Sequence, residues 1–372
     1  MIILHIIQDN KFYESTLTAM EADKEIVNKV VLFTKTKDYK LKYIHDKTDL
    51  IRTIQLSNCR EWINYLKKEE YDVIYFHSIA VSLWMIIPFI PKDKIVAWWG
   101  WGYEMYGAPY GMYPLIKVDL YKDITKTLVK GDKTSFKERV KNGLLKTVFS
   151  RLRNRGLRRI DWFSPVVSYE MELMKNVKGF RAKEFYTPVS LKEGDYSIEE
   201  KKATGNILIG NSSSHTNNHL DIWDKLSKLN IKDRQIVLPL SYGEMDYKDK
   251  VKSTMVSDKN GIIFLESFLP KDEYFKLFNS FSYAIYGVMR QQASENIDYC
   301  LLHGIKLFFY KDSVMYKYYK KNGFVVYTIE DDLNEEELST SLSVDQNKRN
   351  IECFLKDYSY RNKSYQNFKS SI

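Results

Sequence analysis

Short apolar runs recur along the first half of the chain and are separated by longer polar or amphipathic segments. The runs predict strands over 1–7, 29–33, 72–76, 94–98, 161–166 and 183–186, with a helix over 58–68. Runs of this length with β-branched residues, bounded by polar loops, are typical of buried strands. Strands that alternate with helices predict a doubly wound parallel sheet, which binds ligands at the carboxyl ends of its strands.

The second half repeats this alternation more clearly. Strands are expected over 206–209, 235–238, 261–265, 283–286 and 305–309, and helices over 218–228, 246–255, 272–281 and 294–303. A chain of 372 residues is also long for a single core. We therefore expect an N-terminal Rossmann-like domain over 1–187, a polar linker over 188–204, a C-terminal Rossmann-like domain over 205–343, and a helical tail over 344–372 that packs back on the N-terminal domain.

One stretch of the second domain, residues 205–219 (GNILIGNSSSHTNNH), combines a strand, a small polar loop and the start of a helix. This geometry presents backbone N–H groups and the positive end of a helix dipole to an anion such as phosphate. It matches neither the dinucleotide-binding GxGxxG pattern nor the Walker loop, and an ordinary turn between a strand and a helix is the alternative. Arg290, Gln291 and Gln292 precede another helix of this domain and predict a second wall of a diphosphate site.

In the first domain, polar side chains follow three of the expected strands. Asp9, His77 and Glu104 all fall at carboxyl ends, where a general base would be placed. Glu104 lies among Trp99, Trp101 and Tyr103, so burial of that loop would raise the pKa of its carboxyl group. His77 has a plainer alternative, which is a hydrogen bond to a neighbouring loop.

The charge of the chain is concentrated in one segment. The whole sequence carries a net charge of +9, which suits an acidic partner, and residues 131–159 hold ten basic and two acidic side chains. Val140, Leu144, Val148 and Leu152 recur there at four-residue spacing and predict an amphipathic helix with a basic outer face. Docking on an anionic membrane is one interpretation, a solvated helix that covers the sheet is another, and no nucleic-acid-binding motif is present. The candidate membrane-binding residues are Lys141, Lys146, Arg151, Arg153, Arg155 and Arg158.

Other function classes find little support. The three cysteines are far apart and form no CxxC pair or Cys/His cluster, so we expect no metal, no cofactor and a reducing compartment. The first residues lack the features of a signal peptide. The most apolar later stretch, 79–91, is shorter than the roughly 20 residues that span a bilayer. A cytoplasmic protein without a transmembrane anchor is expected.

Two Rossmann-like domains that face each other across a cleft, without GxGxxG, look like the GT-B architecture of nucleotide-sugar glycosyltransferases. More narrowly, the chain resembles the TDP-N-acetylfucosamine:lipid II N-acetylfucosaminyltransferases, the 4-alpha-L-fucosyltransferase family (glycosyltransferase family 56). The residues that carry the resemblance are spread over most of the chain and are densest over 205–330. They are Gly210-Asn211-Ser212, Asn218-His219, Leu238-Pro239, Tyr242, Phe268, Tyr274, Arg290-Gln291-Gln292, Cys300-Leu301-Leu302 and Gly304-Ile305, with Phe76-His77, Leu83-Trp84 and Trp99-Gly100 in the N-terminal half.

The resemblance implies transfer of an amino-deoxysugar from a dTDP-sugar to a polyprenyl-diphosphate-linked saccharide, as in enterobacterial common antigen synthesis. It places the protein peripherally at the cytoplasmic face of a bacterial inner membrane, without nucleic acid. Donor-binding residues would be Gly210, Asn211, Ser212, Asn218, His219, Tyr242, Phe268, Leu269, Arg290, Gln291 and Gln292. The acceptor side, with the candidate base, would come from Asp9, His77 and 99–104.

The chain departs from the family at two places. The family has an acid two residues after its Trp-Gly pair, where this chain has Gly102, with Glu104 two residues further on. The family's glycine-bearing stretch after Arg-Gln-Gln is Ser294-Glu295-Asn296-Ile297 here. A UDP- or GDP-sugar donor for capsule or O-antigen, a GT-B-like nucleotide-sugar epimerase, and a catalytically silent partner in polysaccharide assembly therefore remain as alternatives.

Overall fold

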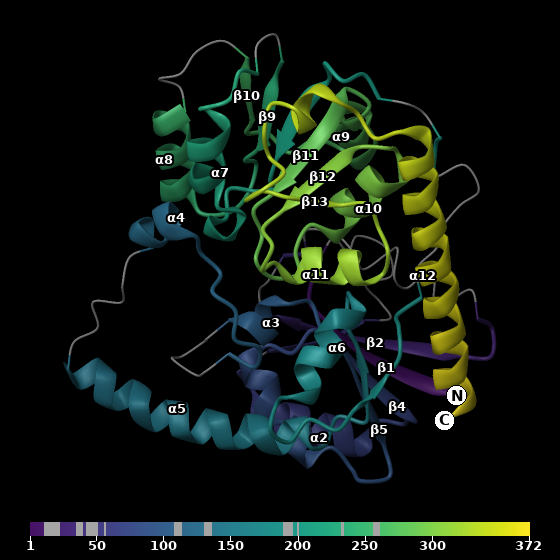
Figure 1. Ribbon diagram of the computed structural model, residues 1–372. Coiled ribbons are helices and arrows are strands. Elements are labelled where there is room, and N and C mark those ends of the chain that lie inside the picture. Colours follow the sequence, from purple (N-terminus) through teal and green to yellow (C-terminus); the bar gives the residue numbers. More distant parts are fainter. Residues whose placement is uncertain are drawn as a thin grey trace. The chain divides into compact units, whose positions relative to one another are not determined.

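The computed structural model describes residues 1–10, 23–34, 40–41, 51–55, 57–107, 114–129, 136–188, 196–198, 201–231, 234–255 and 261–372; for 51–53, 55 and 136–146 it describes the backbone alone. The chain forms two compact units (Figure 1). Unit 1 consists of Met1–Lys117, Lys133–Ser190 and Tyr358–Ile372, and unit 2 consists of Val118–Asp132 and Leu191–Asp357. Each unit is therefore built from segments that are distant in sequence.

The sheet of unit 1 has seven parallel strands in the order β3-β2-β1-β4-β5-β6-β7. The strands are β1 (Ile2–Ile7), β2 (Val27–Thr34), β3 (Ile51–Gln55), β4 (Val73–His77), β5 (Ile95–Trp99), β6 (Trp162–Ser164) and β7 (Lys183–Glu184). Its helices are α2 (Cys59–Lys68), η2 (Val81–Met85), η3 (Ile87–Phe89), α3 (Tyr103–Tyr106), α5 (Phe136–Leu157) and α6 (Ser168–Lys175). The fully buried β4 is apolar from Val73 to Phe76 and ends at His77, and such an apolar run is expected for a strand covered on both faces.

The sheet of unit 2 has six parallel strands in the order β10-β9-β8-β11-β12-β13. The strands are β8 (Asn206–Ile209), β9 (Ile236–Pro239), β10 (Ile262–Leu265), β11 (Phe281–Tyr286), β12 (Lys306–Phe309) and β13 (Tyr327–Thr328). Its helices are α4 (Asp123–Leu128), η5 (His215–Asn217), α7 (His219–Leu226), α8 (Met245–Met255), α9 (Lys271–Phe278), α10 (Ser294–Leu302), α11 (Val314–Lys321) and η7 (Glu337–Ser339). The long helix α12 (Val344–Ser370) begins in unit 2 and ends in unit 1.

The structure confirms the two expected parallel α/β sheets and changes several element boundaries. The strand expected over 206–209 is β8, residue for residue. Phe281, which the sequence placed at the end of a helix, is instead the buried first residue of β11. Strand β3 was not anticipated, and neither was the assignment of 118–132 to unit 2.

The last turns of α12 belong to the core of unit 1. The ring of Phe368 stacks on that of Phe185, with 4.2 Å between their centroids, and meets Trp162 edge-on at 5.2 Å. The Lys369 ammonium pairs with the carboxylate of Asp23. Burial of two or three aromatic rings is worth several kcal/mol (roughly 2 for each large side chain), so these contacts are enough to fix the end of the helix.

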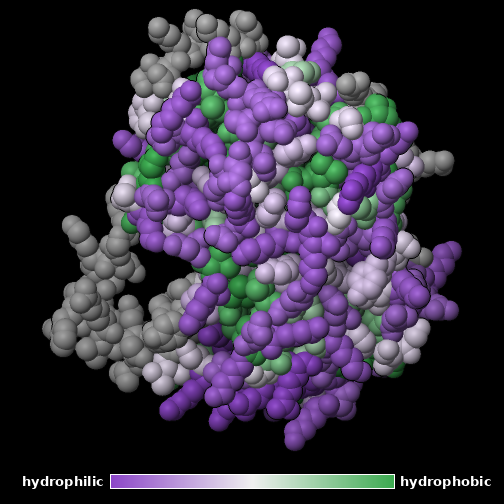
Figure 2. Space-filling model, viewed as in Figure 1, coloured by the Kyte–Doolittle hydropathy of each residue, from purple (hydrophilic) through white to green (hydrophobic). Residues whose placement is uncertain are grey.

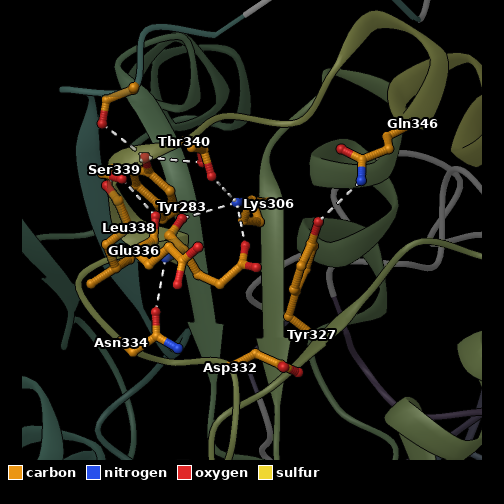
Figure 3. A network of polar contacts seen from close by, with 12 residues as sticks. Tyr283, Lys306, Tyr327, Asp332, Asn334, Glu336, Leu338, Ser339, Thr340 and Gln346 are labelled. Carbon is orange, nitrogen blue, oxygen red and sulfur yellow. Dashed lines mark hydrogen bonds and ion pairs between the residues drawn. The ribbon is translucent and has the colours of Figure 1, made fainter.

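A buried lysine in unit 2 has a structural role (Figure 3). Lys306 lies on β12, and its ammonium donates to the Glu337 carboxylate at 2.8 Å, to the Glu337 carbonyl at 2.9 Å and to the Thr340 hydroxyl at 3.1 Å. The Tyr283 hydroxyl donates to the carbonyl of Leu338 at 2.7 Å in the same network. These partners anchor the segment around η7 against the first residue of β12, at the edge of the sheet opposite to the strand carboxyl ends.

Hydrophilic side chains cover most of the face drawn in Figure 2, and hydrophobic residues reach that face only in small patches. None of the helices in the described parts of the chain combines the length and the apolar character needed to cross a bilayer.

Candidate functional site

The strand order of unit 2 defines where a ligand is expected. Strands β8 and β11 are neighbours, and the connections that leave them run to opposite sides of the sheet, which creates a crevice outside their carboxyl ends. The loops at this point are 210–218 and 287–293, the two stretches that the sequence indicated. A Cβ at Gly287 would lie 2.3 Å from the Asn217 carbonyl oxygen, so only glycine lets these two loops approach each other.

The loop after β8 is held in shape by Asn217, which is fully buried. Its side-chain oxygen accepts from the backbone N–H of Asn211 at 3.2 Å, and its Nδ2 donates to the carbonyl of Ser212 at 3.0 Å and to the Ser212 hydroxyl at 3.1 Å. The loop is therefore organised before any ligand arrives. Asn217 was not among the donor-binding residues expected from the sequence.

Asn218 and His219 lie beneath the loop. Asn218 adopts a left-handed conformation with φ of 51°, and His219 begins α7. Burial lowers the pKa of the His219 imidazole to about 3, so the ring is neutral. A Cβ at Gly210, where φ is +67°, would lie 2.7 Å from Nε2 of this ring. His219 thus fills the space under Gly210, and the structure places both buried side chains in support of the loop.

Three loops are joined by a chain of side-chain hydrogen bonds. Gln292 donates to Oδ1 of Asn211 at 3.0 Å and accepts from the Thr216 hydroxyl at 2.8 Å. Asn211 donates to the Tyr242 hydroxyl at 3.0 Å, and this links the loop after β9. The predicted residues Asn211, Tyr242 and Gln292 are therefore brought together. The side-chain amides of Asn211 and Gln292, however, are used to hold the loops to one another.

Arg290 supplies a positive charge at this edge of the sheet. Its guanidinium donates through Nη1 to the carbonyl of Gln291 at 2.8 Å. Gln291 is buried and donates to the Ser294 hydroxyl at 2.8 Å, and Ala293 precedes α10 with φ of 61°. The cationic side chain and the start of a nine-residue helix therefore lie together, an arrangement that favours anions.

Exposed rings follow the neighbouring strands. Tyr242, after β9, is 50% exposed, and Phe268, after β10, is 68% exposed, while Leu269 is half-buried. The backbone N–H of Leu240 donates to the carbonyl of Leu265 at 2.8 Å, so both loops begin at the same level of the sheet. Their rings provide a surface on which a planar group can stack.

The sequence missed a group of residues on the other side of the loop after β8. His215 stacks on Tyr247 with 4.2 Å between ring centroids. Glu244 accepts from the backbone N–H of His215 at 3.3 Å and from the Ser214 hydroxyl at 3.3 Å. Tyr121 meets His215 edge-on at 6.4 Å, although it stands about a hundred residues earlier in the chain. No local pattern in the sequence could have connected Tyr121 to this loop.

In unit 1 the connections that leave the neighbouring strands β1 and β4 also run to opposite sides of the sheet, so the corresponding switch point lies between these two strands. His77, the last residue of β4, is buried, and its Nε2 lies 3.0 Å from Nδ1 of His5 on β1. The other nitrogen of His5, Nε2, lies 2.9 Å from the side-chain oxygen of Asn28. Because that oxygen can only accept, His5 donates to Asn28 and therefore accepts from His77. Burial and the neighbouring His5 keep the pKa of His77 well below its usual range.

Glu104 lies in the first turn of the short helix α3, which follows β5. The carboxylate is buried and accepts from the backbone N–H of Trp101 at 2.9 Å and from Nε1 of Trp98 at 3.3 Å. Burial, together with the negative charge of Glu104, raises the pKa of Tyr103 to about 12. The neutral Tyr103 hydroxyl donates to Ser78, the left-handed residue that follows His77, at 3.0 Å.

The end of β1 joins this loop. The amide of Gln8 donates to the Tyr103 hydroxyl at 2.9 Å and to the Ser78 hydroxyl at 3.3 Å. Asp9 is the next residue and is half-buried. The three predicted residues Asp9, His77 and Glu104 are therefore sequence neighbours of Gln8, Ser78 and Tyr103, whose side chains are hydrogen-bonded to one another at one edge of the sheet.

A second buried carboxylate was not anticipated. Glu170 on α6 accepts from the Tyr106 hydroxyl at 3.0 Å and from the backbone N–H groups of Val166 and Val167 at 3.1 and 3.4 Å. Burial raises the pKa of Glu170 to about 7, and the charge of Glu104 contributes to this shift. The sequence signal was weak, because a glutamate in the first turn of a helix is ordinary.

The structure of α5 corrects part of the prediction that its basic side chains form an outer face and its apolar side chains a covered stripe. Arg151, Arg155 and Arg158 are exposed, whereas Arg153 is only 8% exposed and burial lowers its pKa. Val148, expected on the covered apolar stripe, is 53% exposed. The helix turns Gly156 toward the protein instead, and a Cβ there would lie 2.8 Å from the Trp84 ring. Lys141 and Lys146 belong to α5, but their side chains lie outside the described residues.

The side chains that the structure describes include no group of three or more His, Cys, Asp or Glu that could hold a metal ion.

Comparison with known proteins adds three findings. The model of the family "4-alpha-L-fucosyltransferase glycosyl transferase group 56" matches residues 145–367, which is more than half of the chain. A search of curated proteins finds no match.

Solved structures match over the whole chain. They include a lipopolysaccharide outer core galactosyltransferase, WaaB, in its apo form (12% identity, 100% of both chains, TM-score 0.62) and sucrose-phosphate synthase from Thermosynechococcus elongatus (8%, 100% of both, 0.64). A third, titled trehalose-6-phosphate from E. coli bound with UDP-2-fluoro glucose, is 10% identical over 100% of this chain and 98% of that one, with a TM-score of 0.60. At these identities the likeness shows the fold, which is GT-B.

Proposed function

The chain belongs to the 4-alpha-L-fucosyltransferase family, glycosyl transferase group 56, and is therefore a glycosyltransferase that uses a nucleotide sugar; from this premise we propose its substrates. The donor is a dTDP-activated amino-deoxysugar similar to N-acetylfucosamine. The acceptor is a polyprenyl-diphosphate-linked saccharide of bacterial surface polysaccharide synthesis. The reaction takes place at the cytoplasmic face of the inner membrane.

The observation that carries the proposal is the arrangement of loops at the β8/β11 switch point of unit 2. Arg290 lies on the loop after β11. Gln292 of the same loop forms hydrogen bonds with Asn211 and Thr216 of the loop after β8. A diphosphate bound there lies beside one cation and the start of α10, which offset the negative charge that grows as it leaves. Tyr242, Phe268 and Leu269 supply the pocket for the nucleobase.

In the proposed reaction, a hydroxyl oxygen of the acceptor forms a bond to the anomeric carbon of the donor sugar. The bond between that carbon and the diphosphate oxygen breaks, and the nucleoside diphosphate leaves with the electron pair. A base on unit 1 takes the hydroxyl proton, and Asp9, His77 and Glu104 are the candidates. His77 is neutral because of its lowered pKa and thus has a lone pair available to accept a proton.

The membrane part of the proposal rests on α5. The exposed Arg151, Arg155 and Arg158 attract an anionic bilayer, each contributing about 1 kcal/mol near the surface. The exposed Val148 on the same helix is positioned to enter the headgroup region. A lipid-linked acceptor would then be reached without a spanning helix.

A direct test is a thermal-shift series with dTDP-, UDP- and GDP-sugars, followed by a transfer assay with a polyprenyl-diphosphate saccharide. A ligand that binds only the folded state stabilises it by RT ln(1 + [L]/Kd), and this stabilisation raises the melting temperature. Stabilisation by dTDP-sugars alone, with product formed only when acceptor is present, is the expected result. Release of an epimerised free sugar nucleotide without acceptor, or binding without product, would contradict the proposal.

The second candidate is the same reaction with a UDP- or GDP-sugar for capsule or O-antigen. It is favoured by the structural neighbour whose title names UDP-2-fluoro glucose and by the different residues that follow Gln292 in this chain. A larger thermal shift with UDP- or GDP-sugars than with dTDP-sugars would support it.

A further inference from the structure

A segment of the N-terminal half of the sequence forms part of unit 2. Residues 118–129, which we call the strap, pack through Val118 and Leu128 against the hydrophobic core of that unit. The carboxylate of Asp221 on α7 accepts from the backbone N–H of Ile124 at 2.7 Å and from the Thr125 hydroxyl at 2.6 Å. It thus caps α4 from a neighbouring helix, which fixes the strap in place.

The strap is fixed most closely around Tyr121. The side chain of Asn218 accepts from the backbone N–H of Lys122 at 2.8 Å and donates to the carbonyl of Leu120 at 3.1 Å. The two neighbours of Tyr121 are therefore bonded to the same side chain, which itself lies under the loop after β8. This leaves Tyr121 little freedom to move away from the loop.

The side chain of Tyr121 borders three loops of the candidate donor site. Its ring meets His215 of the loop after β8 edge-on at 6.4 Å. Burial raises the pKa of its hydroxyl, the charge of Glu244 after β9 raises it further, and the charge of Arg290 after β11 lowers it. Tyr121 thus lies within the electrostatic reach of both charged side chains.

The hydrogen bonds already made at the site distinguish Tyr121 from its neighbours. Asn211 and Gln292 use their amides to join the loops. By contrast, no residue in the described parts of the chain forms a hydrogen bond with the Tyr121 hydroxyl. A half-buried hydroxyl beside the loop after β8, with its proton available and within the electrostatic reach of the Arg290 guanidinium, is suited to donate to an anion.

We propose that Tyr121 is a donor-binding residue and that its hydroxyl donates a hydrogen bond to the diphosphate of the nucleotide sugar, alongside Arg290. The strap then completes a site that residues 205–343 form only in part. The inference rests on the proposed nucleotide-sugar site of unit 2. It adds a contact that comes from the opposite half of the sequence.

The test measures binding of dTDP, UDP and GDP, and of the matching nucleosides, to the full chain by calorimetry. Y121F removes only the hydroxyl. Y299F is the matched control, because Tyr299 is a half-buried tyrosine on α10 that stacks with Phe275 and His303. R290A serves as a reference for loss of the diphosphate contact, and the melting temperature of each variant is recorded.

For the nucleoside diphosphate that binds the wild type, Y121F should weaken affinity by about tenfold or more, the usual effect of losing a hydrogen bond to a charged group. Its affinity for the nucleoside should be unchanged, and Y299F should behave like the wild type. If R290A binds weakly while Y121F matches the wild type, or if Y121F loses nucleoside affinity equally, this inference fails alone. If the wild type binds no nucleoside diphosphate, the proposed function fails with it.

Discussion

Asn218 donates through Nδ2 to the backbone carbonyl of Gly287 at 2.7 Å and so joins the loop after β8 to the loop after β11. The same side chain holds the strap through Leu120 and Lys122. One buried amide therefore connects three segments that come from distant parts of the sequence.

The first prediction concerns this amide. N218A leaves the Gly287 carbonyl and the Lys122 N–H without their partner and should lower the free energy of unfolding by about 2–4 kcal/mol. N218G loses the same bonds but accepts the left-handed backbone at φ of 51°, so it should be about 1 kcal/mol more stable than N218A. Urea midpoints measure both values. A fully stable N218G variant would show that the amide does not hold the loops.

The second prediction concerns Arg290. R290A should lower turnover by roughly 10²–10³-fold, the usual loss when a group that stabilises developing charge is removed. R290K should retain part of the activity, because an ammonium keeps the charge but not the planar guanidinium.

The urea midpoint should be unchanged in both Arg290 variants. R349A is the control, because Arg349 donates to the Gly323 carbonyl elsewhere in unit 2. Near-normal turnover of R290A in steady-state assays would remove this residue from the diphosphate site.

The third prediction uses the raised pKa of Glu170. Folding raises this pKa from its usual 4.5 to about 7, so the folded state binds the proton more tightly. The contribution to stability is fully present below pH 4.5 and is lost as the pH rises through 7. At full effect the loss is about 3 kcal/mol.

E170Q should abolish this pH dependence, while E172Q, on the exposed side of the same helix, should keep it. Urea unfolding at pH 5, 6, 7 and 8 measures the difference. Parallel stability curves for E170Q and the wild type would contradict the assignment.

The fourth prediction concerns α5. R151E/R155E/R158E should abolish co-sedimentation with vesicles that contain anionic phospholipid, because three exposed positive charges become negative and the net charge falls by six units. The control K67E/K68E/K175E makes the same change in net charge at exposed positions of α2 and α6 in unit 1. R153E should instead lower the melting temperature, since Arg153 is buried. Unchanged co-sedimentation of the triple arginine variant would end the membrane proposal.

The sequence by itself determined most of the strands and helices and the general location of the candidate site. Strand β8 was predictable because three consecutive apolar residues, Ile207 to Ile209, stand between Asn206 and Gly210, a short run that is typical of a buried strand. Both candidate loops of unit 2 were also visible, since small polar residues after a strand and before a helix form a local pattern. Gly210, Asn217 and Asn218 are part of the same local sequence pattern.

The tertiary structure decided which of these side chains are used in contacts within the protein. Asn211 and Gln292 have their amides engaged with each other, and His219 lies under Gly210, facts that depend on how two loops meet. Arg153 is buried because Gly156 brings α5 close to Trp84, whereas periodicity alone placed it on the outer face. Tyr121 reaches the site because Asn218 and Asp221 hold the strap to unit 2. Contacts between segments about a hundred residues apart leave no periodic trace in a single sequence, so only the folded chain could reveal them.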